Sequence, residues 1–233
     1  MEQWISFAVG PLFRFAFVLM LLGAARLVLL QVWAVVEARR RAGDRTLPAK
    51  QILKTTLEWT IPFSRLHRLM PLQSFASFAF HAGVILIPVF FAGHVGLWKK
   101  ALGVSWYAFS TAVADPLTIL ALASIGILFG IRLWDRKARF LSGAFDYGVL
   151  ALLFAVFLTG FFSSHPWLSP IPYNVALLLH FLGAEAVIVM IPFTKLSHAA
   201  LYATIRFSSE TGWKFVPDAG EKVAAALGKE GGV

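Results

Sequence analysis

The chain has 233 residues, of which 58% are hydrophobic and only 14% are charged, a balance that excludes an ordinary soluble domain and leaves room for several membrane spans. It contains no cysteine, which excludes disulfides, thiolate metal sites and a cysteine-bound iron–sulfur cluster within this chain. The basic residues that give the net charge of +9 lie between the apolar runs, so the charge indicates membrane topology rather than nucleic-acid binding.

Five apolar runs are each long enough to cross a bilayer, and they predict an all-α integral membrane protein with five transmembrane helices. The N-terminal residues lack a basic region and a small-residue cleavage site, so we expect the first run to be retained as a span. We predict a membrane domain over residues 1–207 and a cytoplasmic tail over 208–233, which contacts a partner or is disordered. The runs cover residues 8–36, 72–98, 111–133, 144–163 and 173–203.

The basic residues favour one orientation of these spans. They gather between the first and second runs, between the third and fourth, and after the fifth, whereas the opposite loops carry only Lys99 and Lys100. By the positive-inside rule, the N-terminus lies outside and the C-terminus lies in the cytoplasm. The first cytoplasmic loop, residues 37–71, contains an amphipathic segment over 47–60 that either lies on anionic lipid or docks a partner subunit.

Two spans carry two histidines each: His81 and His94 in the second, and His180 and His198 in the fifth. Because these spans run antiparallel, His81 is expected at the depth of His198 on the cytoplasmic side, and His94 at the depth of His180 on the outer side. Two imidazoles fill both axial positions of a haem iron, which suits electron transfer. The sequence therefore predicts two stacked haems between the second and fifth spans.

The spacing of the histidines along each span sets their angular positions. Eighteen residues separate His180 from His198, which in a continuous helix is five turns, one face and about 27 Å of rise. Thirteen residues separate His81 from His94, which leaves them about 140° apart on an ideal helix. Pro88 lies between them, and a kink or local unwinding there changes that angle.

Small and basic residues near the histidines suggest how haem is accommodated. Three glycines leave space for a flat macrocycle, namely Gly83, Gly93 and Gly183. Basic residues at the cytoplasmic border are candidates to meet haem propionates, namely Arg65, Arg68 and Lys195. His67 shares the face of His81, but it precedes the span, which argues against a ligand role.

Further polar residues have both a functional and a structural interpretation. His165, with Lys99 and Lys100, is a candidate quinone site, although a loop histidine and a span-end lysine pair are ordinary features. Asp115 either relays protons or caps the third span, and capping is the preferred interpretation. An unpaired carboxylate such as that of Glu185 is energetically costly within a span. We therefore expect Glu185 to form a structural ion pair with Arg14 or Arg26 in preference to transferring protons.

Four segments, residues 80–95, 158–168, 178–198 and 208–213, resemble the haem b (gamma) subunit of respiratory nitrate reductase. The resemblance covers roughly residues 1–215. The spacing in the second span is closer to relatives in sulfite-reduction-associated, quinone-interacting and heterodisulfide-reductase complexes. The resemblance implies that His81 and His198 ligate one haem and that His94 and His180 ligate the other.

The resemblance also implies a role in a prokaryotic cytoplasmic membrane. The chain would be the quinone-reactive subunit of a respiratory complex, passing electrons between menaquinone or ubiquinone and a cytoplasmic iron–sulfur partner. The terminal catalytic site would lie on another subunit, and further membrane or periplasmic subunits are possible.

Two other classes of function remain alternatives: a histidine-lined membrane transporter, and a non-redox structural or assembly subunit. A transporter needs exchangeable ligands along a hydrated path, and more acidic groups at the depths of the histidines. Glu185 alone meets that requirement.

Overall fold

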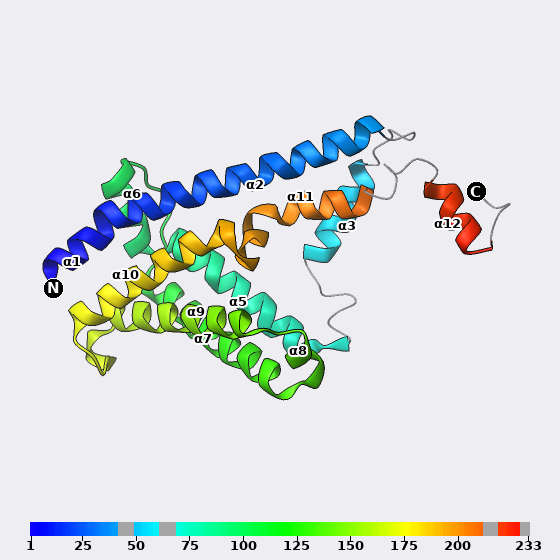
Figure 1. The fold of residues 1–233 in the computed structure, drawn as a ribbon. Coiled ribbons are helices and arrows are strands. Elements are labelled where there is room, and N and C mark those ends of the chain that lie inside the picture. Colours follow the sequence, from blue (N-terminus) through cyan, green and yellow to red (C-terminus); the bar gives the residue numbers. More distant parts are fainter. Residues whose placement is uncertain (42–48, 61–68, 212–218, 229–233) are drawn as a thin grey trace. The chain divides into compact units, whose positions relative to one another are not determined.

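The computed structural model describes residues 1–41, 49–60, 69–211 and 219–228 (Figure 1). Regular structure in these residues is entirely helical, apart from an isolated bridge between Phe91 and Phe109. Within the described residues, five helices are long and apolar enough to cross a membrane, as predicted for an all-α, multi-pass protein. They cover Glu2–Arg40, Pro71–Phe90, Thr111–Trp134, Ala144–Ser164 and Tyr173–Phe193.

The chain divides into two compact units, and the division falls within the first and last spans. The first unit comprises Met1–Phe17 and Phe63–Ile188, and the second comprises Val18–Pro62 and Val189–Val233. The predicted membrane domain of residues 1–207 therefore contributes to both units.

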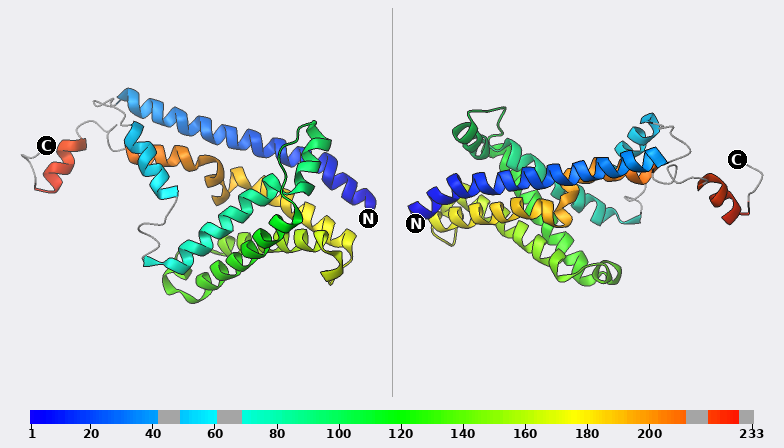
Figure 2. Two further views of the ribbon diagram at one scale, coloured as in Figure 1. Left: turned by 180° about the vertical axis from the view of Figure 1, so that it is seen from behind. Right: turned by 45° about the horizontal axis from the view of Figure 1, so that its top comes forward.

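Three helices form the core of the first unit: α5 (Pro71–Phe90), α7 (Thr111–Trp134) and α9 (Ala144–Ser164). They lie side by side in both Figure 1 and Figure 2, with α7 in contact with α5 and α9. Their buried faces share one apolar cluster, made of Phe80, Ile87, Ala121, Ile125, Leu150, Leu153 and Phe157.

The first unit also contains the following elements. At the N-terminus, α1 (Glu2–Phe7) continues through the π-helical turn η1 (Ala8–Leu12) into α2 (Phe13–Arg41). The other elements are α6 (Ala92–Leu102), α8 (Arg136–Phe140), η2 (Pro166–Leu168) and α10 (Tyr173–Met190). Trp98 of α6 packs edge-on against Phe13 and Phe17 at the start of α2, with ring centroids 5.8 and 4.9 Å apart.

Close packing of α5 on α7 depends on Gly83. A Cβ atom at this position would lie 2.6 Å from the Cβ of Ala121, well inside the contact distance. Gly83 therefore allows the two backbones to approach, as small residues do between membrane helices. Gly126, the first glycine of a GxxxG pattern in α7, has no atom within 4 Å of the position its Cβ would take.

The second unit is also helical in its described part. It contains the rest of α2, together with α3 (Ala49–Thr60), η3 (Ile191–Phe193), η4 (Lys195–Ser197), α11 (His198–Thr211) and α12 (Ala219–Ala226). Helix α3, the predicted amphipathic segment, contacts α11; it buries Ile52 while Leu53 and Leu57 stay exposed. The predicted tail, 208–233, includes the end of α11 and all of α12.

The fifth span is not the continuous helix that the spacing of His180 and His198 assumed. Helix α10 ends at Met190, Thr194 is extended (φ −135°, ψ −173°), and His198 begins a new helix after two 3₁₀ turns. Pro192 cannot donate a backbone hydrogen bond, and the Thr194 hydroxyl donates to the Met190 carbonyl at 2.7 Å. The prediction of one shared face and a fixed axial rise is therefore wrong.

The α5–α7 contact generates a stability prediction. Gly83→Ala should lower the free energy of unfolding by about 1–3 kcal/mol, because the new methyl overlaps Ala121, and Gly83→Ala/Ala121→Gly should recover most of that loss. The matched control is Gly126→Ala, whose methyl enters open space. The measurement is thermal unfolding of the purified protein in detergent; equal stability of Gly83→Ala and Gly126→Ala would contradict the packing.

Candidate functional site

The structure brings together the two histidines that the sequence assigned to the outer side. His94 lies on α6 and His180 lies on α10, both within the first unit. Their ring centroids are 5.9 Å apart and their planes differ by only 15°. Both rings are partly buried, so the pair forms a site within the protein rather than on its surface.

Each of these imidazoles is anchored through Nδ1 to a backbone carbonyl. His94 Nδ1 lies 3.0 Å from the Ile87 carbonyl oxygen, and His180 Nδ1 lies 2.9 Å from that of Val156 on α9. A carbonyl only accepts, so Nδ1 carries the proton in both rings and Nε2 keeps its lone pair. Neither Nε2 has a hydrogen-bond partner within the ranges that the structure describes. Metal-ligating histidines are held in this tautomer by the same kind of contact.

The separation of the two rings fits shared ligation of one metal ion. An imidazole nitrogen binds a metal at about 2 Å, so two rings opposed across one ion have their centroids about 6 Å apart. The observed centroid separation of 5.9 Å is close to that length, and the ring planes of the stacked pair differ by 15°. The donor chemistry of two neutral imidazoles would suit ligation of a haem iron by both residues.

A break in the second predicted span positions His94. The segment 72–98 forms α5 and α6 with Phe91 extended between them (φ −66°, ψ 134°). Three carbonyls before the break are bound from outside α5: Ile87 by His94, Val89 by the Trp106 indole at 2.8 Å, and Phe90 by the Phe109 N–H at 2.6 Å. The break falls one turn after Pro88, so the local unwinding that the sequence left open does occur.

A glycine that the sequence interpretation missed lies directly under His180. A Cβ at Gly160 of α9 would come within 2.8 Å of Cε1 in the His180 ring. The imidazole therefore needs a glycine here. The signal was a lone glycine within the apolar segment 158–168, but nothing in the sequence linked it to His180.

The glycines predicted to border haem have neighbours from the protein itself. A Cβ at Gly183 would meet Val156 of α9 at 2.7 Å, and one at Gly93 would meet the ring of Phe91 at 2.9 Å. With Gly83, which packs on Ala121, these positions serve contacts between and within helices in the structure. Their contact with a macrocycle stays a prediction.

The inner pair lies in two separately described units. His81 Nδ1 is 2.7 Å from the Ser77 carbonyl in α5, and His198 Nδ1 is 2.7 Å from the Lys195 carbonyl. Both rings therefore have the same Nδ1 anchor as the outer pair, while their mutual pairing stays a prediction. Lys195 is exposed in η4. Three inner-side residues lie outside the described residues: Arg65, His67 and Arg68.

The structure gives His165 an acidic partner. Its Nε2 lies 3.1 Å from Oδ2 of Asp115, and its Nδ1 lies 3.1 Å from the Phe161 carbonyl. The expected capping role of Asp115 is wrong, because Ser110 is the N-cap residue of α7 and Asp115 lies within the helix. Its carboxylate is instead directed to the far end of α9.

The two lysines of the candidate quinone site lie elsewhere in the same unit. Lys99 and Lys100 are exposed in the last turn of α6, whose C-cap residue Gly103 is in the left-handed region (φ 74°). Cations are favourable at a helix C-terminus, so this position explains them without a ligand. The structure shows no contact between these lysines and His165 among the described residues.

Glu185 is the least expected feature of α10. The residue is 5% exposed, and neither carboxylate oxygen has a hydrogen-bond partner among the residues described. The predicted ion pair with Arg14, which is exposed in the same unit, is therefore not formed, and Arg26, the other predicted partner, belongs to the second unit. Its neighbours one turn away on the helix are apolar, namely Phe181, Leu182 and Ile188.

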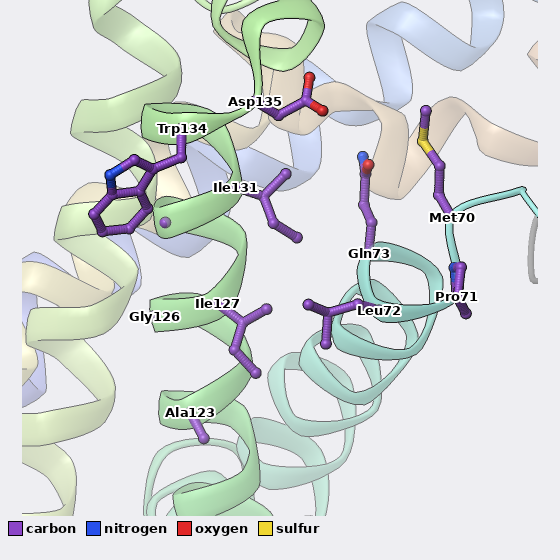
Figure 3. Close-up of a pocket in the computed structure, with 11 residues that line it drawn as sticks. Met70, Pro71, Leu72, Gln73, Ala123, Gly126, Ile127, Ile131, Trp134 and Asp135 are labelled. Carbon is purple, nitrogen blue, oxygen red and sulfur yellow. The ribbon is translucent and has the colours of Figure 1, made fainter.

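An apolar groove of about 740 Å³ lies between the start of α5 and the second half of α7 (Figure 3). Gly126 and Gly130 form part of its α7 wall, and Gln73 and Asp135 provide its polar groups. None of the predicted histidine ligands lines this groove, so it is separate from the His94–His180 site.

Comparison with known proteins gives one relative. A protein of Nitratidesulfovibrio vulgaris (strain Hildenborough) is 34% identical over 151 residues, which is 64% of this chain and 66% of that relative. The chain therefore aligns with just under two thirds of the relative's length, and the relative's name, "Protein", states no function. No family model and no solved structure matches the chain.

Glu185 provides a test of its buried environment. Glu185→Leu should raise the free energy of unfolding by about 1–3 kcal/mol, because it removes buried polar atoms that lack partners. Glu2→Leu, at an exposed site in α1, is the control and should change stability by less. Thermal unfolding in detergent measures both. A loss of stability in Glu185→Leu would mean that the carboxyl has a partner in the assembled protein.

Proposed function

We propose that this chain is a di-haem cytochrome b subunit that anchors a respiratory oxidoreductase complex in a prokaryotic cytoplasmic membrane. The observation that carries the proposal is the His94–His180 pair, with parallel imidazoles 5.9 Å apart in an all-α, multi-pass protein. The Nδ1 contacts of both rings support it, because they leave each Nε2 available to a metal.

Each proposed haem has a pair of ligands in this chain. His94 and His180 would hold the outer haem, and His81 and His198 would hold the inner one. When bound, haem supplies one-electron transfer. The candidates to bind the haem propionates remain Lys195, Arg65 and Arg68.

The site favours haem over the alternative of a metal-ion transporter. A cage for a bare ion is usually built from three or more protein ligands. In the part of the chain that the structure describes, no three His, Asp or Glu side chains gather in this way. A two-imidazole site suits a cofactor that already supplies four equatorial ligands.

The proposed redox partners follow from the absence of cysteine in this chain and from its expected orientation in the membrane. The absence of cysteine means that a cysteine-bound iron–sulfur cluster must belong to another subunit, which we place on the cytoplasmic side. We propose the membrane quinone pool as the other redox partner, with His165 and the lysines Lys99 and Lys100 as the candidate quinone site near the outer face. The terminal catalytic site would be on a different subunit.

The first test is optical. The purified protein should show a b-type reduced-minus-oxidised spectrum, with about two haems per chain by pyridine haemochrome assay, because the chain has two predicted ligand pairs. Protein that is folded in the membrane but contains no b-type haem would overturn the proposal. Bound metal ions without haem would favour the transporter.

The second test separates the two haems. His180→Ala should remove the outer haem and His198→Ala the inner one, so each variant should retain about one haem per chain. Trp167→Phe, at an exposed aromatic residue, should retain both. Haem quantitation and the low-spin electron paramagnetic resonance signals provide the measurement. Two low-spin haems in both histidine variants would contradict the pairing.

A further inference from the structure

The apolar groove between α5 and α7 follows one face of α7. The start of α5, with Met70 and Leu72, forms its other wall (Figure 3). No atom lies within 4 Å of the position that a Cβ would take at Gly126, so this face is open within the described protein. The lining residues of α7 are spaced three or four apart, as on one face of a helix: Ala123, Gly126, Ile127, Gly130, Ile131 and Trp134.

The length of the groove corresponds to one leaflet of a bilayer. Eleven residues separate Ala123 from Trp134, which is about 16 Å of helical rise, or about half of a hydrocarbon core. Trp134 ends α7 and is largely exposed, and tryptophan is typical of the membrane–water interface. The groove therefore extends from the expected cytoplasmic interface to about the middle of the membrane. That length suits an acyl chain, whereas a helix that crosses the membrane needs a contact surface through both leaflets.

Basic residues follow the groove directly in the chain. The exposed residues of α8 include three cations, here called the basic cluster: Arg136, Lys137 and Arg139. Arg139 Nη1 donates to the Leu133 carbonyl at 3.3 Å, so its guanidinium lies against the end of α7. Arg132 lies 4.0 Å from Asp146, but in the part of the chain that the structure describes no carboxylate forms an ion pair with the basic cluster. The cluster is therefore available to an external anion.

The polar groups that line the groove do not oppose a negatively charged ligand. Asp135 Oδ1 accepts from the backbone N–H groups of Lys137 and Ala138, at 2.8 Å each, so its carboxylate caps α8. The three cations of the basic cluster outnumber this single acidic group, which leaves the end of the groove net positive. Gln73 adds an amide that can donate hydrogen bonds.

The end of α8 has the composition of a segment at a membrane surface. Phe140 and Leu141 are 88% and 78% exposed, next to the basic cluster. Exposed apolar side chains among basic residues are typical of a segment that lies in the lipid headgroup region. The basic cluster is therefore expected at the depth of lipid phosphates, at the open end of an apolar groove.

We infer that the α5–α7 groove and the basic cluster bind an anionic phospholipid of the cytoplasmic leaflet. One acyl chain occupies the groove over Gly126 and Gly130, and the phosphate lies at the basic cluster. Guanidinium groups bind phosphate through paired, charge-assisted hydrogen bonds, and anionic lipids are attracted to basic segments at the cytoplasmic surface. The inference is independent of haem and quinone.

The test measures lipid binding to the full-length chain, purified in detergent and washed free of retained lipid. Native mass spectrometry and thermal unfolding compare dioleoyl phosphatidylglycerol with dioleoyl phosphatidylcholine, which has the same acyl chains and no net charge. Phosphatidylglycerol should bind about 10-fold or more tightly, because each Lys or Arg near the lipid phosphate favours the anion. Inorganic phosphate at the same concentration should not stabilise the protein, because it has no chain to fill the groove.

Charge variants test the basic cluster. Arg136→Gln/Lys137→Gln should weaken phosphatidylglycerol binding by about 10-fold or more and leave phosphatidylcholine binding unchanged. Arg136→Lys/Lys137→Arg keeps the charge and should keep most of the preference. The matched control is Arg14→Gln/Lys222→Gln, which removes the same charge from exposed positions in α2 and α12.

A glycine variant tests the groove. Gly126→Leu fills the space of the acyl chain and should weaken binding of both lipids by about 10-fold. Gly148→Leu is the control, because Gly148 is exposed on α9 and also has no atom within 4 Å of its Cβ position. Circular dichroism and size-exclusion chromatography check folding. Should Gly126→Leu not fold, the charge variants at exposed sites decide the outcome.

Several results would overturn the inference. These are equal affinity for the two lipids, stabilisation by inorganic phosphate alone, or a phosphatidylglycerol affinity within two-fold of wild type in Arg136→Gln/Lys137→Gln or in a folded Gly126→Leu. Displacement of the lipid by a co-purifying subunit would identify the groove as a protein interface and would also overturn it. A chain without b-type haem that still prefers phosphatidylglycerol would overturn the proposed function alone and support this inference.

Discussion

A helix that breaks inside an apolar span must find new partners for the carbonyl groups that it releases, because lipid offers none. At the end of α5, the released carbonyls of Val89 and Phe90 accept from the Trp106 indole and the Phe109 N–H, which follow the break in the chain. The Ile87 carbonyl keeps its helical bond from the Phe91 N–H at 3.0 Å and contacts the His94 imidazole as a second partner. The pairing of His94 with His180, and the functional proposal that rests on it, depends on this break.

Some of this arrangement was predictable from sequence. Hydropathy and length predict the five spans because bilayer thickness fixes how long an apolar helix must be. The antiparallel order of the second and fifth spans predicts which histidines share a depth, and His94 and His180 do meet. These are one-dimensional properties, set by position along the chain.

The features that sequence did not predict depend on contacts between helices. Pro88 indicated an irregularity, but the carbonyl partners that hold the break come from 106 and 109. Gly160 is needed only because His180 of α10 lies over it. Asp115 was expected to cap its own helix because the local sequence does not indicate contacts with other helices. Its partner, His165, follows α9 and lies 50 residues later in the chain. The continuous helix assumed between His180 and His198 failed for a local reason instead, because Pro192 and the extended Thr194 follow the end of α10.

The anchors of the outer pair have a consequence for how this site varies in evolution. Both imidazoles are held by main-chain oxygens, at Ile87 and Val156, and substitution of a side chain does not delete a main-chain oxygen. The contacts with the histidines therefore do not constrain the side chains at positions 87 and 156, which are limited only by their packing, Ile87 in the apolar cluster and Val156 beside Gly183. Homologues that share this site should therefore keep both histidines while the residues at positions 87 and 156 vary. A sequence search that requires identity at positions 87 and 156 would miss distant homologues.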